Sequence, residues 1–450
     1  MSKVLVNETS LNGIAAAIRE KNGETTKYKP SEMAAAITAL VIGGGGSGEG
    51  DEGIPFEWGS DLNYWNYSGM WDWYFEKYGN KITTKYITNL NNAFYWSELT
   101  ELPIVLNGGS EYQGVGCSNA FAYAAFMPTK ENLAGIQNYI SSPSYMFYNN
   151  RSFDSVPELY MMATKDNSYE YMFSQLNASE IGTIHNAYML DTGYMFYRSQ
   201  KLRHAPKFEN ARMNNDGLGS MKHTGFMFKE CYSLRDIPED FLKIIYNEKG
   251  GSSYTHFNSQ FEDCYVLDEV VGINPRTKAM TSNIFATTFK NCHRLKNIVF
   301  AKKEDGTPYT VSWKNQTIDL HDNIGWDDQS QSNGAYVVAE GKLERIVRYN
   351  SGITSDKYVN DGATYAALKD DPDWFTNKYE YSRYNHTSAV KTINSLPDAS
   401  TYLATQSSGT NIIKFRQDAG MSTDGGSIGN LTEEEIAVAT AKGWNVVYAV

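Results

Sequence analysis

The stretch Gly225-Phe226-Met227-Phe228-Lys229-Glu230-Cys231-Tyr232-Ser233-Leu234 contains the pattern that decides the fold. After Phe228 come Leu234 six residues later, Ile237 three residues after that, and then Pro238. Complete, shortened or degenerate copies recur along residues 84–301, and each begins at a phenylalanine that we call the anchor. The anchors are Phe94, Phe121, Phe147, Phe173, Phe196, Phe228, Phe261 and Phe289. This self-similarity predicts that the middle of the chain consists of repeated structural units.

The spacing of the anchors indicates the class of repeat. It varies from 23 residues (Phe173 to Phe196) to 33 residues (Phe228 to Phe261), which is the period of a leucine-rich-repeat solenoid. We expect each Leu-x-x-Ile segment to form a short strand whose apolar side chains point into the column. No single unit can bury this surface, whereas stacked units bury a continuous core. The sequence therefore predicts an α+β repeat fold, a leucine-rich-repeat solenoid.

Three of the 4 cysteines occupy one position of the repeat. Cys231, Cys264 and Cys292 each lie three residues after an anchor, where other copies carry Ser97, Asn150 and Ser199. A position that accepts Cys, Ser or Asn is typical of a tight turn that requires a small side chain. We therefore expect a structural role for these thiols rather than metal binding or catalysis.

Two resemblances follow from these motifs. The segments at 145–150, 225–234 and 288–295 resemble the BspA-like leucine-rich repeats, whose units read roughly MFxxCxxLxxIP, and the likeness covers about half of the chain. That family includes bacterial surface adhesins and viral attachment proteins. The amino-terminal segments Leu5–Leu11, Ala15–Gly23 and Tyr28–Met33 resemble a module that begins many tail and fibre proteins of bacteriophages. Together they imply a virion component assembled in the host cytoplasm.

Composition and charge exclude several other classes of protein. The chain has 450 residues with a net charge of -12, which argues against a phosphate-binding nucleic-acid surface. Only 4 cysteines in this length cannot form a disulfide scaffold. We expect no membrane insertion and no secretory signal, because the apolar stretch Met33–Val41 is too short and residues 1–7 precede no apolar core. The 32 tyrosines are the unusual feature, and because they exceed the packing need that the repeat explains, they indicate a recognition surface.

Residues 1–41 predict a small helical hairpin. Ser10 and Ser31 are suited to cap its two helices, and helices of about ten residues are not stable alone. We expect this module to anchor the chain to other virion proteins and to make a homo-oligomer, or alternatively to fold back on the main body. The Gly-rich residues 42–53 form a flexible linker.

The remaining domain boundaries follow from where the repeat pattern begins and where it is no longer recognisable. Residues 54–80 are the densest aromatic run and predict a cap on the first unit of a solenoid at 81–301. An irregular insertion is expected at 302–388, and carboxy-terminal repeats and a cap at 389–450. In the latter, Thr432–Glu435 is a capping box that predicts a helix, which Gly443 ends before a final strand.

Two groups of side chains are candidates for contact with a ligand. In the aromatic run, rings next to Asp and Asn suit stacking against a sugar; they are Trp58, Trp65, Trp71 and Trp73. Between the expected strand anchors, a mixed-charge stripe points out of the column, and its candidate contacts are Arg203, His204, Arg235 and Asp236. The alternatives are a purely structural cap for the first group and a solvated face for the second.

The sequence contains no recognisable catalytic motif. The HExxH and GxSxG patterns are absent, and the 7 histidines show no ligand spacing, so we expect no catalytic residue, no metal and no cofactor. Paired carboxylates of a glycoside hydrolase require no motif, and such a pair is conceivable in the insertion at 302–388. We therefore expect a non-enzymatic phage structural protein of a tail, baseplate or head that attaches to a host-surface glycan or protein. The alternatives are a virion glycan depolymerase, a purely architectural subunit and a bacterial surface adhesin.

Overall fold

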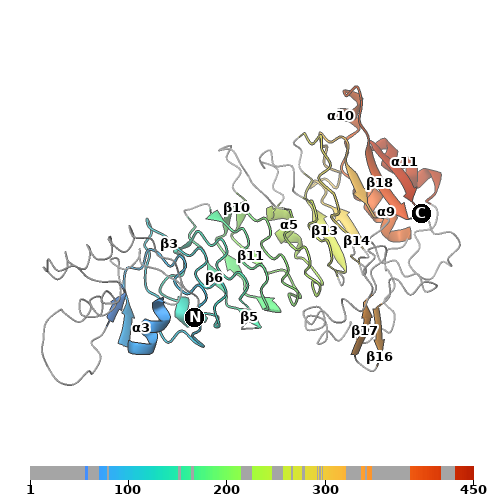
Figure 1. Cartoon of the computed structure of the whole chain (residues 1–450). Coiled ribbons are helices and arrows are strands. Elements are labelled where there is room, and N and C mark those ends of the chain that lie inside the picture. The colour runs from blue at the N-terminus through green and yellow to red at the C-terminus, as the bar shows by residue number, and fades with distance from the viewer. Residues whose placement is uncertain are drawn as a thin grey trace, which may run out of the picture. The chain divides into compact units, whose positions relative to one another are not determined.

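The structure of the chain is a computed structural model in which short strands and tight turns predominate (Figure 1). The chain divides into two units, Met1–Ile54 and Pro55–Val450, and all the described residues belong to the second. The predicted helical hairpin at 1–41 and the linker at 42–53 lie outside them. The described residues are 56–58, 70–78, 81–150, 154–163, 167–213, 225–245, 257–264, 267–275, 279–290, 292, 295, 297–320, 336–339, 342–346, 386–416 and 431–449.

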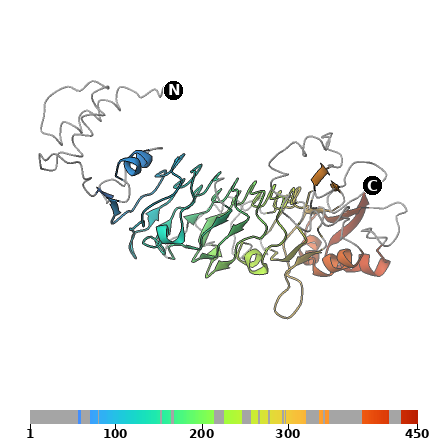
Figure 2. The ribbon, with the colours of Figure 1, turned by 90° about the horizontal axis from the view of Figure 1, so that it is seen from below.

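Strands from successive segments pair side by side, and among the described ladders only that of β16 with β17 is antiparallel. Figure 2 shows the consecutive segments next to one another, in the order of their colours. The parallel sheets consist of β1 (Phe56–Trp58) and β2 (Ile82–Thr84); β3 (Val115–Gly116) and β4 (Ile140–Ser141); β5 (Ser155–Val156) and β8 (Glu180–Ile181); β6 (Leu159–Tyr160), β9 (Ile184–His185) and β11 (Phe208–Glu209); β7 (Asn167–Ser168), β10 (Tyr188–Asp191) and β12 (Arg212–Met213); β13 (Glu269–Ile273) and β14 (Asn297–Phe300); and β15 (Thr317–Asp319), β18 (Asn411–Arg416) and β19 (Trp444–Ala449). The antiparallel pair is β16 (Tyr336–Ala339) and β17 (Lys342–Ile346).

The anchor phenylalanines stack on one another through the core. All eight are buried, and each ring lies nearly parallel to the next, with centroid separations from 5.0 Å (Phe196 to Phe228) to 6.0 Å (Phe228 to Phe261). Offset stacking at such distances is favourable beyond the burial of the rings. The residues that share a position in the sequence repeat therefore share a position in space.

Backbone hydrogen bonds around each anchor join one unit to the next. The amides of Asn92, Phe94 and Trp96 donate to carbonyls of the following unit, whereas the amides between them bond within their own turn. This alternation places the residues two before and two after an anchor at positive φ, for example Tyr171 at 55° and Gln175 at 57°. Non-glycine residues adopt this conformation at a cost, and the ladder between units offsets that cost.

The position three residues after the anchor carries a second link between units. The thiols of Cys231, Cys264 and Cys292 each donate to the carbonyl of the preceding unit's anchor at 3.0 Å. Ser199 and Asn150 make the equivalent bond to their preceding anchors. Burial raises the pKa of each of these thiols, so they stay protonated at neutral pH. The small polar side chain at this position is a hydrogen-bond donor in the core.

Aromatic side chains and a helix cover the first anchor. Trp58 of β1 and Trp71 of α3 (Met70–Tyr78) are fully buried and stack at 3.6 Å, and Trp58 packs edge-on against Phe94. Asp72 of α3 accepts hydrogen bonds from the Ser97 hydroxyl and from the amide of Glu98. Two further short helices, α4 (Lys130–Leu133) and α5 (Glu239–Ile245), lie between strands of later units.

Helices also pack at the carboxy-terminal units. In α9 (His386–Ser395), the Thr392 hydroxyl donates to the carbonyl of Ile298, which ties the helix to β14. Helix α10 (Ser400–Ala404) precedes β18. The predicted capping box of Thr432 with Glu435 is confirmed at the start of α11 (Glu433–Ala441), as is the final strand β19 after Gly443.

The stack extends further than the expected boundary at residue 302. Met280 pairs in parallel with Trp313, Thr310 pairs with Asp398, and β15 pairs with β18. In this unit the buried Trp313 lies opposite Met280 and contacts the ring of Phe285 edge-on, and Gln316 bonds to the backbone of the preceding unit. These residue types differ from the repeat pattern, which is why spacing alone placed 302–320 in the insertion. Residues 321–335 and 347–385 of the expected insertion lie outside the described residues.

Gln260 provides a test of how the core is packed. Its side-chain amide is fully buried without a hydrogen-bond partner. Gln260 directly precedes the anchor Phe261, and other units carry a methionine at this position: Met172, Met195 and Met227. Replacing Gln260 by methionine removes an unsatisfied polar group, so we expect the free energy of unfolding to rise by about 1–3 kcal/mol in urea titrations.

Gln175 is the matched control, because its amide donates to the Tyr148 hydroxyl at 2.7 Å. The substitution Gln175→Met should therefore lower the free energy of unfolding. Equal or lower stability of Gln260→Met would contradict the interpretation that this amide is unsatisfied.

Candidate functional site

A column of half-buried aromatic rings runs beside the anchors. The sequence Tyr-Met-Phe occurs in three successive units, with the tyrosine two residues before the anchor, and Phe-Met-Phe follows in the fourth. The first rings of these motifs are Tyr145, Tyr171, Tyr194 and Phe226. Each stacks on the next, with centroid separations of 4.8, 4.7 and 4.8 Å in that order. Each has a positive φ, so the backbone that supplies the ladder also fixes these side chains. Their edges reach solvent, whereas the anchors do not.

A second set of rings, from the two positions after the anchor, packs against this column. Trp96 stacks on Tyr123 at 4.4 Å, and Tyr123 contacts Tyr148 edge-on at 5.4 Å. Tyr148 in turn lies edge-on against the first column, as Tyr197 does further along. We call the combined surface the tyrosine face; it consists of Tyr95, Trp96, Tyr123, Tyr145, Tyr148, Tyr171, Tyr194, Tyr197 and Phe226.

The phenols of this surface are neutral hydrogen-bonding groups. Partial burial raises the pKa of Tyr145, Tyr148, Tyr171 and Tyr194, and burial together with Glu230 raises that of Tyr197 to about 12. These hydroxyls therefore keep their protons throughout the physiological range of pH. A neutral phenol can both donate and accept a hydrogen bond.

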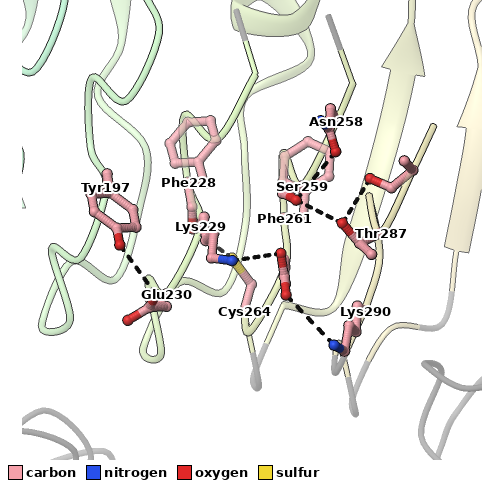
Figure 3. Close-up of polar contacts among 12 residues, drawn as sticks. Tyr197, Phe228, Lys229, Glu230, Asn258, Ser259, Phe261, Cys264, Thr287 and Lys290 are labelled. Carbon is pink, nitrogen blue, oxygen red and sulfur yellow. Dashed lines mark hydrogen bonds and ion pairs between the residues drawn. The ribbon is translucent and has the colours of Figure 1, made fainter. Parts of the chain in front are cut away.

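Beyond Phe226, the same positions carry charges and hydroxyls (Figure 3). Glu230 accepts from the Tyr197 hydroxyl and from Arg198, the latter at 2.9 Å. Glu262 binds Lys229 at 2.7 Å and lies 3.8 Å from Lys290. The two positions that follow Phe226 in the first column are Ser259 and Thr287, whose hydroxyls are 2.6 Å apart. The aromatic column therefore ends at Phe226, and ion pairs between units continue the surface.

The tryptophans predicted as ligand contacts are placed differently from one another. Trp58 and Trp71 are fully buried, so neither presents a ring to solvent. Trp73 is 43% exposed, and Lys77 lies over its ring at 5.1 Å. Trp65 is outside the described residues. Aromatic density alone could not separate rings that cover the core from rings that face solvent.

The predicted charged contacts do lie side by side. The amide of Arg235 donates to the carbonyl of Arg203, and His204 Nδ1 is 2.7 Å from Asp236 Oδ2. The histidine and the carboxylate are both about half exposed. Because His204 and Asp236 bind each other, this stripe has less free charge than its sequence suggests.

A denser charged cluster crosses the neighbouring ladder of β6, β9 and β11. His185 lies 2.7 Å from Glu158 and 3.2 Å from Glu209, and it stacks on Tyr160 at 4.1 Å. Lys130 binds the second oxygen of Glu158 at 2.7 Å. Hydrogen bonds from Lys130 and His185 lower the pKa of Glu158 to about 2. Both ring nitrogens of His185 lie next to a carboxylate, so the cluster ties together four successive units, which contribute Lys130, Glu158, His185 and Glu209.

This cluster predicts how stability depends on pH. The lowered pKa of Glu158 means that its ionised form stabilises the folded state above its ordinary pKa of 4.5, and that this contribution disappears as pH falls toward 2. We expect the melting temperature of the wild type to fall more steeply between these pH values than that of Glu158→Gln. At neutral pH the variant should melt at the lower temperature.

Thermal melts at a series of pH values measure this difference, with Glu101→Gln at an exposed position as the control. Parallel curves for the wild type and Glu158→Gln would show that the pairs with Lys130 and His185 contribute nothing to stability.

The described residues show neither a metal site nor a membrane-spanning helix. Within the ranges that the structure describes, no cluster of His, Cys, Asp and Glu is arranged to hold a metal ion. No helix in these ranges has the length and apolar character required to cross a membrane. No protein-family model, curated protein or solved structure matches the chain.

Sequence reasoning missed the tyrosine face, although a signal was present. The repeated Tyr-Met-Phe motif starts at Tyr145, Tyr171 and Tyr194, each two residues before an anchor. Equal positions in a stacked repeat lie next to one another, so the three tyrosines had to form a column. Trp96 belongs to the second set of rings and is not part of a repeated motif, because the ring that it stacks on is a tyrosine.

Proposed function

We propose that this chain is a non-enzymatic structural protein of a phage virion, in which a BspA-like leucine-rich-repeat solenoid displays a host-attachment surface. The repeat and the phage-like amino-terminal segments support the proposal, as does the stacking of equivalent anchors in parallel units. Residues 1–41 hold the chain on other virion proteins and make a homo-oligomer. The protein is located on the virion, which is assembled in the host cytoplasm.

The observation that carries the attachment role is the tyrosine face. Its rings are packed on one another yet retain solvent-facing edges, and Trp96 remains 55% exposed. Aromatic residues with one apolar and one polar end are enriched where proteins bind partners. A contiguous aromatic surface of this kind is uncommon on a protein without a binding partner.

Binding to bacterial cells tests the attachment role. We expect the labelled full-length chain to bind at least one strain of a panel, and Trp96→Ala to weaken that binding by about tenfold or more, as for a large aromatic contact. Tyr112→Ala is the matched control, since Tyr112 is 90% exposed and lies outside the tyrosine face.

Each other outcome points to a different function. Wild-type affinity of Trp96→Ala would exclude Trp96 as a contact in attachment, and absence of binding to every strain would favour an architectural subunit. Release of reducing ends from the cell polysaccharide would instead identify a depolymerase.

Deletion of residues 1–53 tests the anchoring role separately. We expect particles produced with the deleted chain to lack it, because the interactions with other virion proteins lie in this segment. Immunoblots of purified particles, with cell binding by the deleted chain as the control for folding, measure this. Normal incorporation into particles would exclude the segment as the anchor.

A further inference from the structure

We infer that the tyrosine face binds a neutral, hydroxyl-rich glycan chain that lies along the column of Tyr145, Tyr171, Tyr194 and Phe226. The inference rests on the proposed attachment function and adds the class of ligand, its direction and the groups that contact it. It is argued from what stacking leaves exposed, from charge and from the repeat of the column.

Stacking covers the faces of the rings and leaves their edges. Tyr171 lies between Tyr145 and Tyr194 at 4.8 and 4.7 Å, and Tyr194 lies between Tyr171 and Phe226 at 4.7 and 4.8 Å. A ligand therefore meets ring edges and phenol hydroxyls. The edge of an aromatic ring carries partial positive charge, and the phenol donates a hydrogen bond. Both favour the oxygen atoms of hydroxyl and ether groups.

The charges around the column select against an acidic ligand. The first-column positions from Asn119 to Ser259 carry no charge. Burial and, after it, the carboxylate of Glu170 raise the pKa of Tyr145 and Tyr194, which places a negative charge near the column. The two cations beside the column are already paired: the guanidinium of Arg198 is bound to Glu230 at 2.9 Å, and the ammonium of Lys229, 6.0 Å from the centre of the Phe226 ring, is bound to Glu262 at 2.7 Å. A neutral glycan satisfies these conditions, whereas a polymer rich in carboxylate or phosphate does not.

The column presents one ring for each unit, so a chain that follows it meets equivalent groups at equal steps. Each further sugar then adds a contact at high effective concentration, and affinity should rise with chain length until the column is spanned. Trp96 adds exposed aromatic surface on the second set of rings, where the C–H face of a sugar can stack.

The structure itself supplies the variant that tests the inference. Phe226 occupies the same column at 4.8 Å from Tyr194 without a hydroxyl, so phenylalanine fits this position. The triple substitution Tyr145→Phe, Tyr171→Phe and Tyr194→Phe removes three hydroxyls and keeps the stack. Tyr112→Phe removes an exposed hydroxyl outside the tyrosine face and is the matched control.

The probe is the surface polysaccharide of a strain that binds the full-length chain, separated by anion exchange into neutral and acidic fractions and partly hydrolysed to a series of lengths. In calorimetric titrations we expect the neutral fraction to bind, with affinity that increases with length. The triple variant should bind it at least about tenfold more weakly, because three hydrogen bonds are lost. The control should bind normally.

Several results would overturn the inference while the attachment function stands. These are binding of the acidic fraction alone, cell binding abolished by protease treatment of the cells, affinity independent of length, and unchanged affinity of the triple variant. If the triple variant melts below the wild type, the single variant Tyr171→Phe repeats the test. Failure of the proposed function is distinguishable, because the chain would then bind no strain at all.

Discussion

The hydrogen-bonded contact between successive anchors is the constraint on which the rest of the structure depends. Alternate amides around each anchor donate to the next unit, which forces residues such as Tyr171 and Gln175 into the left-handed region. In an isolated unit, this left-handed backbone would cost conformational free energy, and no hydrogen bonds to a neighbouring unit would offset that cost. Each unit is therefore stable only between neighbours, and Trp58 with Trp71 supplies the missing neighbour for Phe94.

This constraint fixes the chemistry of each column of side chains. Three residues after the anchor, a buried donor such as Cys264 or Ser199 meets the carbonyl of the preceding anchor. Two residues before the anchor, a ring meets the ring of the next unit, as Tyr171 meets Tyr194. A surface on this fold is therefore composed column by column, and one residue type repeated at one position yields a continuous strip.

Much of this arrangement could be predicted from spacing, because stacked units turn equal sequence positions into neighbours. The cysteine position and the capping box at Thr432 are examples in which local chemistry and structure agree. Spacing failed after residue 302, where the buried Trp313 and Gln316 pack against the preceding unit without matching the repeat pattern. It also could not show that Trp58 and Trp71 are buried, since burial depends on which segment packs on the first anchor.

The excess of tyrosine has a physical explanation in the column beside the anchors. A side chain there must fill the space between two neighbouring rings and also place one end in water. Leucine or valine would expose an apolar end and could not stack, whereas tyrosine stacks through its ring and hydrates its hydroxyl. Stacking together with hydration of the hydroxyl thus accounts for part of the 32 tyrosines. The same requirement leaves a row of phenols at the surface, so a recognition surface of neutral donors needs no residue beyond those that already hold the column together.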